Sequence, residues 1–161
     1  MSKIRRSGVL FGAVFIYALT AGIIPDVFAK KKQRTVPEDK RIELQDGGPY
    51  QGEWQAKDLT FTYEYTKEPG RIAINGEVKF KRAKRLDTFT LEANLIDTEG
   101  HVLHRQRIGI AGGRREIQVV PTKAEIKAPE GTWGVAFSYS GTTRGIGEGA
   151  GSPNQFWLTP W

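Results

Sequence analysis

The chain has 161 residues, a length typical of one domain, and 39% of them are hydrophobic, which is enough for a modest core. It contains no cysteine, which excludes disulfides, a thiol nucleophile and the lipid-modified cysteine of a lipoprotein. The formal net charge of +6 is a mild excess that identifies no partner by itself.

The N-terminal segment has the three parts of a secretory signal peptide. Basic residues occur within positions 3–6, an apolar run covers residues 8–24, and small residues lead up to Ala29. We therefore expect residues 1–29 to be a signal peptide that is removed on export.

A second interpretation of the same segment is an uncleaved membrane anchor, a helix over residues 8–24. The run approaches the roughly 18 apolar residues of a transmembrane candidate. The basic cluster at residues 30–34 would favour retention on the cytoplasmic side of the membrane. Under either interpretation the rest of the chain is exported, in the periplasm or outside the cell, or is held at the inner membrane.

Residues 30–53 are polar, contain Pro37 and Pro49, and show no sustained hydrophobic periodicity. This composition is typical of a flexible polar linker. The folded domain is then expected at residues 54–161.

From Asp58 onward the hydrophobic residues recur at every second position, which indicates β-strands with one buried face. Glu68-Pro69-Gly70 and the stretch from Asp97 to Gly100 supply turn residues between such runs. Strands are expected at residues 58–65, 72–80, 89–95, 101–110, 116–120, 124–127, 133–139 and 155–158.

About seven short strands joined by turns predict an all-β fold, an antiparallel two-sheet sandwich, with a small barrel as the alternative. The pattern over Leu59–Leu158, and especially the strand-turn-strand piece LEANLIDTEGHVL, resembles immunoglobulin-like and fibronectin type III-like domains of bacterial envelope proteins. The resemblance implies an immunoglobulin-like sandwich and carries no functional residues with it.

A glycine-rich stretch, GTTRGIGEGAGSP at residues 141–153, fits the loose dinucleotide pattern G-x-G-x-x-G/A. In that pattern the loop opens a helix whose amides meet a pyrophosphate, whereas here Pro153 and a final strand follow. We interpret the stretch as a loop, with an anion-binding nest helped by Arg144 as the alternative. No cofactor is expected.

A basic run, KFKRAKR, is the strongest charge feature, and we expect it on a loop between two strands. Such cations could bind anionic lipid or polysaccharide, or could be solvated charges that discourage aggregation through strand edges. The candidate ligand residues are Lys79, Lys81, Arg82, Lys84 and Arg85, and Arg105, Arg107, Arg114 and Arg115 would extend the patch if the hairpin tips converge.

Nucleic acid is not an expected partner. Binding to it would add exposed aromatic residues beside the cations, but Phe80 and Phe89 fit the buried phase of their strands.

Three of the four tryptophans are candidate contact residues. Trp133 is in phase with the buried residues of its strand. Trp54, Trp157 and Trp161 are not, so they could stack on sugar rings, anchor a protein partner, or cover open ends of the fold.

Residues for catalysis are few. His101 and His104 are three positions apart and so lie on opposite faces of a strand, while Asp97 and Glu99 fit a hairpin turn. We expect no catalytic residue, no metal site and no enzymatic activity.

The expected function is therefore that of an exported, noncatalytic module that binds or scaffolds another envelope protein. Its contact surface would be an exposed strand edge or the aromatic residues near Trp157 and Trp161. The alternatives are a binder of anionic envelope polymer or lipid through the basic loop, and a carbohydrate-binding accessory domain.

Overall fold

The computed structural model describes residues 35–143 and 154–161. This part of the chain is almost entirely strand, with one short 3₁₀ helix, η1 (Glu38–Lys40). The strands are β1 (Ile42–Glu43), β2 (Gly47–Gln55), β3 (Leu59–Glu68), β4 (Arg71–Ile96), β5 (Val102–Lys127), β6 (Gly134–Thr143) and β7 (Asn154–Leu158). Every pairing is antiparallel, so the all-β prediction is confirmed.

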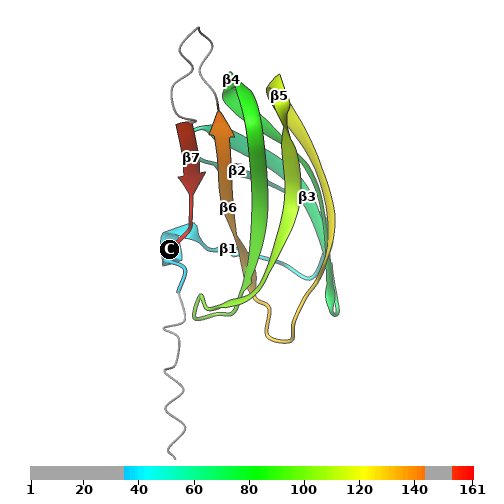
Figure 1. Ribbon diagram of the computed structural model, residues 1–161. Coiled ribbons are helices and arrows are strands. Elements are labelled where there is room, and N and C mark those ends of the chain that lie inside the picture. Colours follow the sequence, from blue (N-terminus) through cyan, green and yellow to red (C-terminus); the bar gives the residue numbers. More distant parts are fainter. Residues whose placement is uncertain (1–34, 144–153) are drawn as a thin grey trace, which may run out of the picture. The chain divides into compact units, whose positions relative to one another are not determined.

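The seven strands belong to one curled sheet (Figure 1). β4 and β5 form a long hairpin, and the other edge of β4 pairs first with β3 and then with β6. The sheet therefore has two arms. The first arm consists of β2, β3, residues 71–80 of β4 and residues 119–127 of β5; the second consists of residues 86–96 of β4, residues 102–112 of β5, and β6 with β1 and β7.

The basic run lies where the sheet bends, and the predicted loop there is wrong. Lys79 pairs with Val119 and Lys84 pairs with Ile117, so residues 80–83 stand opposite Gln118 alone. Extra residues on one strand bend it without ending it. The two strands expected at 72–80 and 89–95 are therefore one strand, β4, and the expected strands between residues 101 and 127 are likewise one strand, β5.

The core lies between the two arms and is rich in aromatic rings. Phe137 of β6 contacts Phe61 of β3 edge-on, with ring centroids 5.1 Å apart, and it contacts Trp54 of β2 at 5.6 Å. Nearer the bend, the rings of Phe80 and Phe89 are 5.0 Å apart. The residues at alternate positions of the predicted strands are buried as expected: Leu59, Phe61, Tyr63, Tyr65, Ile72, Ile74, Val78, Phe80, Phe89, Leu91, Ala93, Leu95, Val135, Phe137 and Tyr139.

Residues 35–53, which we expected to belong to a flexible linker, are part of the sheet domain. Val36 is fully buried, and its backbone N–H donates to the carbonyl of Gly100 at 2.9 Å. β2 pairs with β3 at Gly47 and again from Tyr50 to Gln55, and Tyr50 packs against Tyr65. Glycines and a proline hid the alternation of this edge strand, so the ordered domain begins well before residue 54.

Several predictions concern residues that the structure does not describe. These are the signal peptide at 1–29, the alternative anchor at 8–24, the first residues of the linker, and the glycine-rich stretch from Arg144 to Pro153. Within residues 35–143 and 154–161, no helix is long and apolar enough to cross a bilayer.

Candidate binding surface

The outer face of the second arm is the side of that arm turned away from the core. Leu91 and Ala93 of β4 point inward, so Thr90, Glu92 and Asn94 point outward. Residues directly opposite each other on neighbouring strands share a face. The outward residues of β6, β7 and β5 are therefore Ser138, Ser140 and Thr142, Gln155 and Trp157, and Arg105, Arg107 and Ile110.

One row across this face carries two exposed hydrophobic side chains. Trp157 of β7 pairs with Ser140 of β6, Ser140 pairs with Thr90 of β4, and Thr90 pairs with Ile110 of β5. Trp157 is 65% exposed and Ile110 is 68% exposed. Three strand spacings separate them, about 14 Å. The row is a strip of two hydroxyl side chains, Ser140 and Thr90, with a large apolar group at each end.

A buried polar network lies beside this row. Asn94 is fully buried, and its Nδ2 donates to the carbonyl of Ala136 at 2.9 Å and to Oγ of Ser138 at 3.0 Å. Nε of Arg105 donates to Oδ1 of Asn94 at 2.9 Å. Because both ends of the Asn94 amide are bonded, the network fixes the residues around it.

Arg105 is held on three sides. Besides Asn94, its guanidinium lies 3.9 Å from Oε2 of Glu92 and stacks over the ring of Trp161, 4.6 Å from the ring centroid. These contacts are made with Asn94, Glu92 and Trp161, away from the basic run. Arg105 therefore does not extend the basic patch, which we expected it to do if the hairpin tips converged. Trp161 in turn packs against Val36, Ile96 and Ala136.

The three candidate tryptophans therefore have different surroundings. Trp54 is half-buried against Phe137 and Tyr139, on the core side of the sheet. Trp161 is half-buried beneath Arg105, and Trp157 alone of the three is largely exposed. Trp133, expected to share the buried face of β6, instead packs on the other face against the cluster that Val36, Ile96 and Ala136 form.

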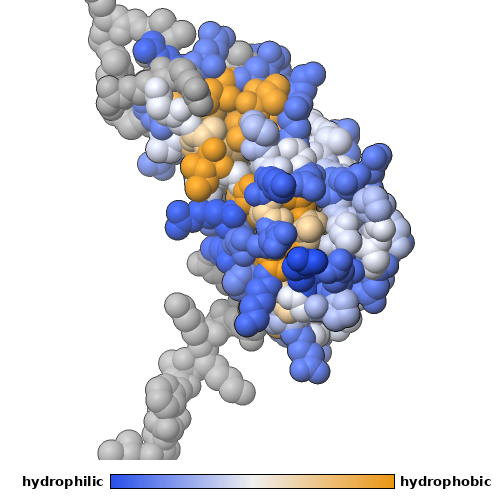
Figure 2. All heavy atoms as spheres, turned by 90° about the vertical axis from the view of Figure 1, so that its right-hand side faces the viewer, coloured by the Kyte–Doolittle hydropathy of each residue, from blue (hydrophilic) through white to orange (hydrophobic). Residues whose placement is uncertain are grey.

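β5 offers a second surface. Within the described residues it pairs only with β4, so one edge has no neighbouring strand. A hollow of about 430 Å³ along β5 is lined by Ile110, Ala111 and residues 116–121. Figure 2 shows hydrophobic side chains gathered on this side of the molecule and bordered by hydrophilic ones. Register shifts in the β4–β5 ladder and Pro121 interrupt the regular backbone that an added strand needs.

The basic run gains a neighbour that the sequence does not indicate. Register between β3 and β4 brings the β2–β3 turn beside the bend, and the N–H of Lys81 donates to the carbonyl of Asp58 at 3.0 Å. Lys57, Asp58, Lys81 and Arg82 line a hollow of about 470 Å³. Lys79, Lys81, Arg82 and Arg85 are exposed, and the side chain of Lys84 is outside the described part of the structure.

Asp58 in this hollow is fixed from the core side. Its Oδ2 accepts a hydrogen bond of 2.9 Å from the hydroxyl of Tyr139, which is buried. Burial, and then the Asp58 carboxylate, raise the pKa of Tyr139 well above its ordinary value. The bond links the β2–β3 turn of the first arm to β6 of the second arm.

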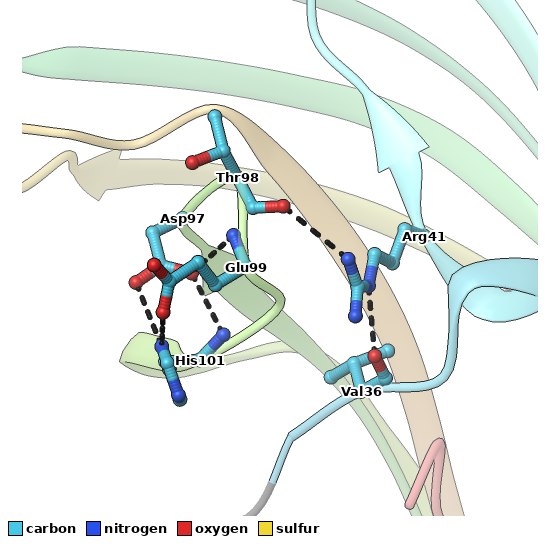
Figure 3. Close-up of polar contacts among 6 residues, drawn as sticks. All are labelled: Val36, Arg41, Asp97, Thr98, Glu99 and His101. Carbon is cyan, nitrogen blue, oxygen red and sulfur yellow. Dashed lines mark hydrogen bonds and ion pairs between the residues drawn. The ribbon is translucent and has the colours of Figure 1, made fainter.

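The histidine and acidic residues after β4 form a turn, as expected (Figure 3). Oδ1 of Asp97 accepts from the backbone N–H groups of Glu99 and His101, at 2.9 and 2.8 Å, and Oδ2 lies 3.1 Å from Nδ1 of His101. Burial alone would raise the pKa of the Asp97 carboxyl, but these hydrogen bonds outweigh burial and lower it.

Arg41 ties this turn to the N-terminal segment, since its Nε donates to the carbonyl of Val36 and its Nη1 donates to that of Thr98. Among the residues that the structure describes, no three histidine or acidic side chains are placed to hold a metal ion.

Comparison of the chain with protein-family models, with curated proteins and with solved structures gives no match. What the domain binds must therefore be inferred from its own residues.

Proposed function

We propose that this chain is an exported, noncatalytic module that binds another envelope protein through the outer face of its second arm. The observation that carries the proposal is the row from Trp157 to Ile110. These two residues are the most exposed large hydrophobic side chains of the described part, and they lie on the same face.

The chemistry of the row suits a protein partner. Tryptophan is among the residues that most often dominate binding energy at protein interfaces, because its large ring buries much area at little entropic cost. Ser140 and Thr90 between the two anchors are small, so a partner could approach the sheet closely. The Asn94 and Arg105 network holds one border of the strip in place, which reduces the entropy lost on binding.

We further propose that the two arms serve as the two layers of an immunoglobulin-like sandwich. Supporting this finer description, rings from β2 and β3 pack directly against β6: Trp54, Phe61 and Tyr63 all contact Phe137. The arrangement leaves the outer face of each layer for binding.

The direct test is photo-cross-linking of the full chain in its native host, with a photoreactive amino acid in place of Trp157. We expect an adduct with one protein, and we expect Ile110→Asp in the same chain to abolish it. The matched control places the same photoreactive residue at Asn75, which is exposed on the outer face of the first arm and lies outside the hollow that Ile110 lines. Equal adducts from both positions, or an adduct that survives Ile110→Asp, would reject this surface.

A point substitution is a better probe here than removal of β7. Phe156, beside Trp157, packs against Phe80, Phe89 and Tyr139 in the core, so deletion would disturb the fold. Trp157→Ala removes only an exposed ring, and we expect it to change the free energy of unfolding by no more than about 0.5 kcal/mol.

The hydroxyl groups beside Trp157 favour a second candidate, carbohydrate binding. A flat exposed ring can stack on a sugar, while Ser140, Thr90 and Thr142 supply hydrogen-bonding groups on the same face. Binding of the full chain to a glycan array would distinguish the two candidates. Glycan binding should be lost in Trp157→Ala and kept in Ile110→Asp, whereas a protein partner needs both anchors.

A further inference from the structure

We infer that the hollow beside the sheet bend is a binding site for a phosphate monoester group, separate from the proposed protein-binding face. The site consists of Lys57 and Asp58 from the β2–β3 turn and of Lys81 and Arg82 from β4. The turn and the bend are brought together by the register that pairs Leu59 with Phe80.

The first argument is that three cations converge without partners. Lys57, Lys81 and Arg82 are exposed and form no salt bridge with any residue that the structure describes. Two cations elsewhere in the domain are paired, by contrast: Lys67 lies 2.9 Å from Asp46, and Arg71 pairs with Glu68. Like charges that share one hollow repel each other, and a bound anion would reverse that cost.

The second argument is that Asp58 sets the charge of the site. Its carboxylate is held by the Tyr139 hydroxyl at 2.9 Å, so it remains at the wall of the hollow. Three cations and one carboxylate give the described residues of the lining a net charge of +2. A phosphate monoester carries a charge of about −1.5 to −2 at neutral pH, which complements the site better than a singly charged carboxylate or phosphodiester does.

The third argument concerns shape. The bend moves residues 80–83 out of register with β5, and it places Lys81 and Arg82 opposite the turn in a hollow of about 470 Å³. Lysine ammonium and arginine guanidinium groups are the side chains that proteins use to donate charge-assisted hydrogen bonds to phosphate oxygens. A soluble phosphate compound and a phosphomonoester lipid headgroup both present this chemistry.

The test uses the full chain and two probes at low ionic strength. Inorganic phosphate is titrated by calorimetry, and phosphatidic acid in phosphatidylcholine vesicles is tested by co-sedimentation, with pure phosphatidylcholine vesicles as the baseline. We expect Lys81→Gln with Arg82→Gln to weaken binding about tenfold or more, because two cations are lost from one site. Lys123→Gln with Lys127→Gln removes the same charge from the exposed face of β5 and should change binding less than twofold.

Asp58→Asn provides a test with the opposite sign. Asparagine can still accept the Tyr139 hydrogen bond but removes the only negative charge among the described lining residues, so binding should become several-fold tighter. Binding of inorganic phosphate by the chain indicates a soluble ligand, and binding to phosphatidic acid vesicles alone indicates a lipid headgroup. The inference is overturned if neither probe binds above baseline, if both double variants lose binding equally, or if Asp58→Asn binds no more tightly than the natural chain.

Discussion

The outer faces of the two arms differ, although the same alternation of hydrophobic and polar residues builds both. On the first arm, Gln51, Glu64, Asn75 and Lys123 form one row across four strands, and all four are exposed. On the second arm, Asn94 and Ser138 also point away from the core, yet they are buried. Alternation of hydrophobic and polar residues thus predicts which side chains point away from the core, but it does not predict whether those side chains are exposed to solvent.

The difference comes from hydrophobic residues that pack on the outer side of the second arm. Val36, Ile96 and Ala136 form a second hydrophobic cluster on the outer side of the second arm, and Trp133 and Trp161 pack against it. One end of this face is therefore covered, while the end with Trp157 and Ile110 is open. The outer face of the second arm is partly covered and carries two largely exposed apolar side chains, so it is better suited to a specific contact than the more polar face of the first arm.

The largest effect is expected where the arms meet. Phe137→Ala removes a ring that contacts Trp54, Phe61 and Tyr63, at centroid distances of 5.6, 5.1 and 5.2 Å. We expect a loss of about 3–5 kcal/mol in the free energy of unfolding, because a buried cavity is left between the two arms. Urea denaturation followed by tryptophan fluorescence measures it, with Val119→Ala as a control that should be nearly neutral. A loss below about 1 kcal/mol would show that the arms do not depend on this contact.

A matched pair of asparagines tests the contrast between the faces directly. Asn94→Ala deprives Nε of Arg105 and the carbonyl of Ala136 of buried partners, so we expect a loss of about 1–3 kcal/mol. Asn75→Ala, at an exposed position of the first arm, should cost no more than about 0.5 kcal/mol. The measurement is again urea denaturation. Equal costs for the two variants would mean that the network adds nothing beyond its position in the sheet.

The sequence was sufficient to predict the β-strands and most of the core. Alternation placed Phe61, Leu91 and Phe137 correctly, because a strand with one buried face must show period two. It failed where the structure departs from that condition. The alternation that runs to Phe80 breaks where the strand bulges out of register with β5, and β2 is an edge strand in which glycine takes inward positions such as Gly52.

The candidate sites were harder to predict from the sequence, because their residues come from segments that are far apart in the chain. The exposure of Trp157 followed from its phase relative to Phe156 and Leu158, but its alignment with Ile110 depends on three pairings among distant segments. Lys57 lies far from the basic run in sequence, and only the β3–β4 register brings them together. Trp133 was assigned to the wrong face because β6 begins one residue after it.

The smallest expected effect concerns the hydrogen bond between the arms and depends on pH. Burial, aided by Asp58, raises the pKa of Tyr139 above the ordinary value of 10.0, so the folded state keeps this proton when the unfolded state has lost it. The stabilisation is complete below about pH 10, and the free energy of unfolding should fall by up to about 1.4 kcal/mol per further pH unit for this group. Tyr139→Phe should cost about 1–2 kcal/mol at pH 8 and should make the alkaline decline shallower. Urea denaturation at about pH 8 and about pH 11 measures both quantities.

The pKa of Tyr63 is also raised by burial, so part of the alkaline decline in stability should persist in Tyr139→Phe. An unchanged slope in this variant would show that Tyr139 ionises equally in the folded and unfolded states.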